Sequence, residues 1–378
     1  MPTNAYFDWN ATAALRPEAK TAVEVALDTT GNPSSVHASG RAARRLVEDA
    51  REKVAALIGA TPREVVFTSG GTEANVLALS PALGETLLVS TIEQPSVRSG
   101  GRFAVVEDAP ATAAGVIDLM ALESLLKGRT RPLVSLMLAN NETGVIQPVA
   151  EAASLVHAAG GRLHVDAVQG PGRIGCDFRT LAADLMTLSS HKIGGPQGVG
   201  ALIVRDGLTL DALVKGGGQE RGVRAGTENV AGIAGFGAAA DAVRLGFAAE
   251  TARMAALRGD LETGIKAVAP KAVIFGAEAP RLPNTTLFSV PGMKAETAVI
   301  AFDLEGIAVS SGSACSSGKV APSHVLAAMG VVPELARGAI RVSLGYATTS
   351  DDVGTILKAW EKLAEGLYKA GNHQEIAA

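Results

Sequence analysis

Cysteine, aromatic side chains and clustered charge are all scarce in this chain of 378 residues. Its two cysteines, Cys176 and Cys315, cannot form a disulfide framework and fit a reducing compartment. Aromatic residues make up 4% of the sequence, and the formal net charge of −4 comes without a long basic block. These properties argue against a nucleic-acid-binding protein, because duplexes require basic surfaces and single strands require stacking platforms.

Long apolar runs are also missing. No uninterrupted apolar stretch is long enough to cross a bilayer, and residues 1–10 do not show a basic segment followed by an apolar one. We therefore expect a cytoplasmic protein that does not bind membranes. The chain is nevertheless 47% hydrophobic and contains 43 glycines, which favours an α/β enzyme with a large core.

Short apolar runs alternate with helix-like segments in the first two thirds of the chain. In residues 41–58, Val47, Ala50, Val54 and Leu57 recur at helical spacing. The alternation predicts a largely parallel sheet covered by helices, with ligands at the carboxyl ends of its strands. The expected strands are 65–68, 86–90, 133–138, 163–166, 185–188 and 201–204.

The pattern changes after about residue 245. A helix over 247–268 is expected to act as a connector, followed by strands that include 285–290 and 339–343 and by a closing helix over 350–369. We predict a large domain of residues 13–246, and a smaller α+β domain formed by residues 1–12 and 247–378.

Two strand ends carry residues that suit pyridoxal phosphate (PLP). Lys192 precedes a Gly-rich turn, a position suited to an amine that reacts with a carbonyl group, although a surface lysine would fit equally well. Asp166 ends the 163–166 strand and could keep a pyridine nitrogen protonated, and Gln169 could donate to a phenolic oxygen. An isolated aspartate in this position more often caps a helix.

Two further segments extend this pattern. Gly71 and Thr72 open a helix within residues 68–75, where free N–H groups could bind phosphate, although an ordinary capped helix has the same signature. Cys315 lies among small residues in segment 309–318, which suits an exposed loop that carries a thiol between two sites. Cys176 has an ordinary setting and is expected to be structural.

Phosphate turn, Asp–Gln pair and lysine occur in the order that a type I PLP enzyme requires. The chain resembles the class V aminotransferase family, specifically the NifS/IscS-type cysteine desulfurases, nearly from end to end. Segment 311–315, which ends in Cys315, makes the match specific. The matching segments are 6–12, 140–144, 164–167, 190–192, 216–222, 224–227, 311–315 and 340–345.

The resemblance implies a type I PLP-dependent transferase fold and a role for each matching residue. Lys192 would hold PLP covalently, Asp166 would pair with its pyridine nitrogen, and Gln169 would bond its phenolic oxygen. The phosphate would be held by Gly71, Thr72, Ser189 and His191, and by Thr227 of the neighbouring subunit in an obligate homodimer. Asn141 would contact cofactor and substrate, and Arg341 would bind the carboxylate of the amino acid. Asn10 is also expected near the substrate.

The reaction implied by the resemblance converts L-cysteine to L-alanine and leaves a persulfide on Cys315. The sulfur would pass to an iron–sulfur scaffold or another acceptor protein. No intrinsic metal site is expected, although Cys315 could transiently ligate an iron–sulfur cluster.

Gln94 departs from the family pattern. The family has a histidine stacked on the cofactor at this point, whereas this chain has Glu93-Gln94. We expect Gln94 to stack on the ring and offer a hydrogen bond, but an amide cannot shuttle protons, so the enzyme should be slow. His37 is the one substitute we consider.

Other functions remain open at this point. The chain could be another class V enzyme, such as a selenocysteine lyase or a transaminase, or a catalytically weakened sulfur-relay protein. The Cys315 segment speaks against a transaminase, and intact Lys192 and Asp166 oppose loss of catalysis.

Overall fold

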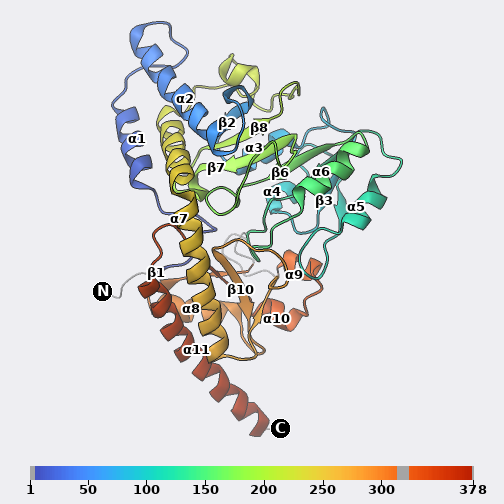
Figure 1. Ribbon diagram of the computed structural model, residues 1–378, viewed down its shortest axis with the longest axis vertical. Helices are drawn as coiled ribbons and strands as arrows, with labels where there is room; N and C mark the ends of the chain where they lie inside the picture. Colours follow the sequence, from blue (N-terminus) through green and yellow to red (C-terminus); the bar gives the residue numbers. More distant parts are fainter. Residues whose placement is uncertain (1–4, 313–322, 377–378) are drawn as a thin grey trace.

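The computed structural model describes residues 5–312 and 323–376, and its largest sheet has seven strands (Figure 1). Their order is β2-β8-β7-β6-β5-β3-β4, and only β8 runs antiparallel to its neighbours. This confirms the mostly parallel α/β sheet. The strands are β2 (Val65–Thr68), β3 (Thr86–Ser90), β4 (Glu107–Ala109), β5 (Pro132–Ser135), β6 (Arg162–Asp166), β7 (Leu185–Ser189) and β8 (Gly200–Val204).

Most predicted strands agree with the structure within a residue, but two differ. β5 ends at Ser135 rather than at 138, although the N–H groups of Leu136 and Leu138 still donate to the carbonyls of His164 and Asp166 on β6. The edge strand β4 was not predicted, because its sequence Glu107-Asp-Ala109 is short and acidic and lacks an apolar run.

Helices cover both faces of this sheet. One face packs against α2, α5, α6 and α7, and the other against α3 and α4. α2 begins at Ala38, three residues before the predicted start, because Nδ1 of His37 accepts a hydrogen bond from the N–H group of Gly40 (3.2 Å). The helices of this part are α1 (Pro17–Leu27), α2 (Ala38–Leu57), α3 (Gly71–Ala78), α4 (Pro95–Arg98), α5 (Leu119–Leu126) and α6 (Val149–Ala158), with 3-10 turns η1 (Pro62–Glu64), η2 (Ser190–Lys192) and η3 (Gln219–Gly222).

The helix α7 (Val230–Val268) is longer than the predicted 247–268 segment and runs along both parts of the molecule (Figure 1). Its glycine-rich first half packs very closely on α2. A Cβ atom on Gly237 would lie 2.5 Å from the Cα atom of Ala50, so a larger residue would push the helices apart. By length and composition α7 could cross a membrane, but half of its most apolar window is buried in the protein, as expected of a core helix.

The second part of the molecule is built on an antiparallel sheet of order β12-β13-β10-β9, with β1 pairing parallel to β11. Phe7 packs into its core with Phe288 and Trp360, so residues near the N-terminus join the C-terminal part. The closing helix reaches Ile376, beyond the predicted end at 369. The elements are β1 (Ala5–Tyr6), β9 (Val273–Ile274), β10 (Thr285–Ser289), α8 (Ala295–Leu304), β11 (Ile307–Ala308), β12 (Ser310–Ser311), α9 (His324–Ala328), α10 (Pro333–Arg337), β13 (Ile340–Ser343) and α11 (Ser350–Ile376).

The core of this second part is separate from the core around the large sheet. The predicted boundary between residues 246 and 247 falls inside α7. We keep the division into 13–246, and 1–12 with 247–378, as a proposal.

Candidate active site

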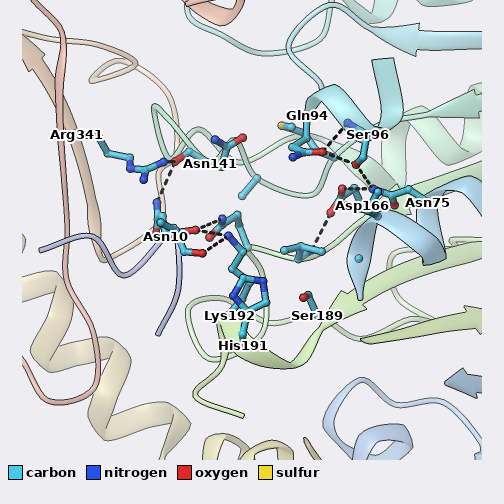
Figure 2. A pocket seen from close by; sticks show the side chains of 17 residues that line it. Asn10, Asn75, Gln94, Ser96, Asn141, Asp166, Ser189, His191, Lys192 and Arg341 are labelled. Carbon is cyan, nitrogen blue, oxygen red and sulfur yellow. Dashed lines mark hydrogen bonds between the residues drawn. The ribbon is translucent and has the colours of Figure 1, made fainter. Parts of the chain in front are cut away.

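A cavity of about 280 Å³ opens where the carboxyl ends of the parallel strands meet the second part of the molecule (Figure 2). Its volume is near the lower limit of about 300 Å³ for small-molecule pockets. The sequence-predicted residues that line it are Asn10, Gly71, Thr72, Gln94, Asn141, Asp166, Gln169, Ser189, His191, Lys192 and Arg341. Residues far apart in the sequence are therefore brought into one site.

Lys192 ends the 3-10 turn that follows β7, which places its amine in the cavity. Nζ donates to the carbonyl oxygens of Asn10 (2.6 Å) and Ala11 (2.8 Å). These neutral acceptors hold the amine beside the N-terminal segment. Gln169 reaches the same segment, because its Nε2 donates to the carbonyl of Asn10 (3.0 Å), while its Oε1 is buried without a partner among the described residues.

Asp166 ends β6 and is 7% exposed. Its Oδ2 accepts from Nδ2 of Asn75 (2.9 Å), and its Oδ1 accepts from the N–H group of Val168 (3.0 Å). Burial raises the pKa of Asp166, while these two hydrogen bonds and the charge of Lys192 act in the opposite direction. A carboxylate held in this way is well placed to bind a protonated ring nitrogen.

The N-terminus of α3 forms another wall of the cavity. Gly71 begins the helix, and a Cβ atom there would come within 3.1 Å of the Val168 side chain, so a larger residue would fill the space above the turn. The first N–H groups of a helix have no intrahelical acceptors and favour anions. Thr72, Ser189 and His191 lie around the same part of the cavity.

His191 is held in a neutral form beside Lys192. Its Nδ1 lies 3.1 Å from the hydroxyl of Thr12. Burial, with a smaller effect of the neighbouring Lys192 charge, lowers the pKa of His191 to about 4. At neutral pH this ring can therefore donate one hydrogen bond, but it adds no charge to the site.

Arg341 projects from β13 at the opposite side of the cavity and is 2% exposed. One guanidinium nitrogen, Nη2, pairs with Oδ1 of Asp8 (2.6 Å), and Nη1 donates to the carbonyl of Asn141 (3.0 Å). Its Nε is buried without a partner among the described residues. The group is thus fixed in orientation and retains donor capacity for a carboxylate.

A carboxyl group lies close to this guanidinium. Burial raises the pKa of Glu142 to about 7, although the hydroxyl of Ser323, which donates to Oε2 (2.5 Å), and the charge of Arg341 act in the opposite direction. Near neutral pH, Glu142 is therefore divided between its protonated and ionised forms.

Gln94 and Asn10 take part in the framework of the cavity. Gln94 caps the N-terminus of α4, because its Oε1 accepts from the N–H group of Ser96 (2.7 Å). Nδ2 of Asn10 donates to Oγ1 of Thr285 (2.9 Å) and to the carbonyl of Asn141 (3.1 Å). Asn10 thus joins the two parts of the molecule at the site.

Four predicted residues have other placements. Thr227 is exposed and does not line the cavity of its own chain, and His37 caps α2 without lining it. Cys315 lies outside the described residues. Cys176 is buried, as predicted, and burial raises the pKa of its thiol above the usual range, so it is a poor nucleophile.

The structure adds site residues that the sequence interpretation missed. Asp8 holds Arg341, Asn75 holds Asp166, and Ser96 holds Gln94. Asp8 and Asn75 stand inside segments that drew attention for other residues, so a search for partners of Arg341 and Asp166 could have found them. No feature of the sequence singled out Ser96.

These residues fit PLP. A carboxylate, an amine and a helix N-terminus surround one cavity, and each matches one functional group of that molecule: ring nitrogen, aldehyde and phosphate. The lack of a side chain at Gly71, where a Cβ atom would crowd Val168, and the fixed carboxylate of Asp166 support the fit most directly.

Comparison with known proteins gives a consistent result. Residues 5–356 match the family model of class V aminotransferases. The chain is 42% identical to a cysteine desulfurase of Cereibacter sphaeroides, with 96% of each chain covered. It is 39% identical to the cysteine desulfurase IscS of Dictyoglomus turgidum, covering 97% of this chain and 96% of the relative. The solved NifS-like protein from Rickettsia africae superposes with a TM-score of 0.89 at 37% identity, covering 97% of this chain and 99% of the other.

Proposed function

The chain belongs to the class V aminotransferase family and is a cysteine desulfurase with the type I fold, and we propose from this which of its residues bind the cofactor and the substrate and which take part in the reaction. Lys192 holds PLP covalently, and Cys315 accepts the sulfur of L-cysteine. The observation that carries the proposal is the meeting of Lys192, Asp166, the N-terminus of α3 and Arg341 in one cavity (Figure 2).

Each wall of the cavity supports one part of this assignment. Asp166 binds the pyridine nitrogen, Gln169 bonds the phenolic oxygen through its remaining N–H, and the phosphate lies at the N-terminus of α3. Gly71, Thr72, Ser189 and His191 complete the phosphate site. When bound, PLP supplies an electron-withdrawing ring that stabilises negative charge on the carbon atoms of the substrate.

Arg341 and Asn141 orient the substrate. The guanidinium binds the carboxylate of L-cysteine, for which its fixed orientation is an advantage, because little side-chain freedom is lost on binding. The side-chain amide of Asn10 donates to the backbone carbonyl of Asn141, and the backbone carbonyl of Asn10 accepts a hydrogen bond from Nζ of Lys192.

Two residues of the chain, Lys192 and Cys315, take part directly in the reaction. Nζ of Lys192 would remove the proton from Cα of the substrate. Sγ of Cys315, as a thiolate, attacks the sulfur of the substrate. A sulfur–sulfur bond forms as the carbon–sulfur bond breaks, the electron pair stays on carbon, and a proton then completes alanine. Cysteine and one thiol thus become alanine and one persulfide without any outside oxidant.

The persulfide suits transfer to an acceptor protein, and we propose an iron–sulfur scaffold in the cytoplasm as that acceptor. We also propose a homodimer, in which the exposed Thr227 of each chain completes the phosphate site of the other. The acceptor is inferred from the family of the chain, and the homodimer also from the exposed position of Thr227 outside the cavity of its own chain.

Product analysis tests the proposed activity. The purified enzyme, loaded with PLP, should release alanine from L-cysteine in the presence of a thiol reductant, with sulfide in equal amount. Cys315→Ser should still bind PLP and cysteine but release almost no sulfur, and Cys176→Ser should match the wild type. A keto acid that retains the sulfur atom (3-mercaptopyruvate) as the main product would indicate a transaminase, and turnover restricted to selenocysteine would indicate a lyase for that substrate.

A further inference from the structure

The hydroxyl of Ser96, which the reaction scheme above does not use, lies at the centre of a hydrogen-bonded chain. Nδ2 of Asn75 donates to Oγ of Ser96 (2.9 Å) and to Oδ2 of Asp166 (2.9 Å). Oγ of Ser96 in turn donates to Oε1 of Gln94. Figure 2 shows the chain running along one wall of the cavity.

The direction of every bond in this chain is determined by its end groups. The carboxylate of Asp166 only accepts, so Asn75 must turn its nitrogen toward it. The N–H group of Ser96 only donates, so the atom of Gln94 that it contacts must be the oxygen. The single proton of the Ser96 hydroxyl then goes to Gln94, because Asn75 already donates to the hydroxyl oxygen.

This direction determines what Gln94 presents to a ligand. Both bonds from Ser96 go to its oxygen, so the amide nitrogen is the atom on the other side, away from Ser96 (Figure 2). Gln94 lines the same cavity as Asn141 and Arg341. A ligand in the cavity therefore meets a neutral hydrogen-bond donor at this position.

Capping of α4 does not by itself account for the hydroxyl. The cap needs only the backbone N–H group of Ser96, and alanine would provide that group equally well. The hydroxyl adds the link to Asn75, which is 1% exposed and would otherwise have a buried N–H without an acceptor.

We propose that Ser96 is a positioning residue, whose hydroxyl fixes Gln94 as a hydrogen-bond donor toward substrate and cofactor and fixes Asn75 as the donor that holds Asp166. The inference rests on the proposed PLP site. It gives Gln94 a role that differs from proton transfer, and it assigns to Ser96 a role that acts through Gln94 and Asn75.

Three variants of serine residues test the inference. Ser96→Ala removes the hydroxyl, Ser96→Thr keeps it, and Ser99→Ala is a matched control, because the hydroxyl of Ser99 is on the same turn but bonds only the carbonyl of Ser96 among the described residues. The dissociation constant for PLP is measured on the full chain by titration of the apo form, together with KM and kcat for L-cysteine and the unfolding temperature.

Ser96→Ala should raise the PLP dissociation constant and the KM for cysteine about five- to tenfold, because one buried N–H loses its acceptor and Gln94 loses one of two donors. Ser96→Thr should restore both values, and Ser99→Ala should match the wild type. Wild-type values for Ser96→Ala would overturn the inference. So would equal defects in Ser96→Ala and Ser96→Thr at an unchanged unfolding temperature.

Gln94→Glu tests the donor directly. The carboxylate keeps both bonds from Ser96 but presents an oxygen to the cavity instead of an N–H group. We expect the KM for cysteine to rise at least about tenfold, from the loss of a donor and the repulsion of the substrate carboxylate. An unchanged KM would show that the amide nitrogen contacts no ligand. A wild-type enzyme that binds no PLP would instead refute the proposed function itself.

Discussion

Nζ of Lys192 donates to two backbone carbonyls in the cavity that it lines. Lys192→Ala should abolish covalent binding of PLP and all turnover. Borohydride reduction of the PLP-loaded wild type, followed by peptide mapping, should place the cofactor on Lys192. A reduced adduct on any other lysine would refute the assignment.

From the sequence resemblance, Gln94 is expected to stand where the family has a histidine over the cofactor. Gln94→His introduces a group that titrates near pH 6.5, so turnover should rise by up to about a hundredfold and become pH-dependent between about pH 6 and 7. The turnover of both enzymes across pH tests this expectation. A fast wild type, slowed by the substitution, would show that Gln94 is an adapted replacement and not a handicap.

At the scale of single residues, the sequence identified the groups that line the cavity better than the groups that hold them. Lys192, Asp166 and Arg341 could be found because each carries a chemical group that the cofactor or substrate requires. Asp8 acts through a hydrogen bond to Arg341, which is distant in sequence. Ser96 acts through a hydrogen bond to Gln94, two residues earlier in the same turn. Such hydrogen-bond partners are brought together by the folded structure, and the spacing of residues along the sequence does not reveal them.

Among the elements, the central strands of the large sheet carry a buried polar triad behind the site. His164 on β6 lies between Ser135 on β5 (Nδ1 to Oγ, 2.8 Å) and Thr187 on β7 (Nε2 to Oγ1, 3.0 Å). The side chain is 0% exposed, and burial lowers the pKa of His164 to about 3. Burial thus keeps the imidazole neutral, and the two hydroxyls bond its two ring nitrogens.

This triad predicts a loss of stability in acid. The pKa of His164 is lower in the folded state than in the unfolded state, so its contribution is complete above about pH 6.5 and declines as the pH falls toward 3. Between pH 7 and pH 5 the wild type should lose about 2 kcal/mol of unfolding free energy from this residue. His164→Gln should lack that component in denaturant titrations at each pH. Parallel losses in wild type and variant would contradict the account.

Element boundaries were predictable where apolar runs are bounded by polar residues, as in β2 and β3. The boundaries were less predictable where packing against another element determines whether a segment is helical. The start of α7 lies in a stretch rich in glycine, which is a weak helix former, but close contact with α2 favours glycine there, as at Gly237. The predicted connector at 247–268 is therefore the second half of one long helix.

At the scale of the whole molecule, the proposed homodimer makes each cofactor site depend on two chains. Thr227→Ala should raise the PLP dissociation constant about tenfold, because a hydrogen bond to a charged phosphate is lost. Lys192→Ala should be inactive. A mixed dimer of these two variants contains one site with both residues intact, so its one active site should bind PLP with the wild-type dissociation constant and give about half of the wild-type activity.

Co-expression of the two variants with different affinity tags, followed by sedimentation and activity assays, tests the shared site. An active site of the mixed dimer that binds PLP as weakly as Thr227→Ala does, or a fully active monomer, would rule it out.

The overall architecture could be predicted because strand ends, glycine turns and helical periodicity follow from local sequence. The assembly of the cavity could not be read in the same way. Its walls come from the N-terminal segment at Asn10, the large sheet at Asp166 and the second part at Arg341, which meet only in the folded chain. The family resemblance supplied that juxtaposition in advance.

The location of sulfur after one turnover tests the central proposal most directly. The PLP-loaded enzyme is mixed with one equivalent of L-cysteine without reductant, then digested, and the peptides are analysed by mass spectrometry while alanine is quantified. We predict one extra sulfur atom on the peptide that carries Cys315, together with an equal amount of alanine. Alanine formed without sulfur on Cys315, or sulfur found on Cys176, would contradict it.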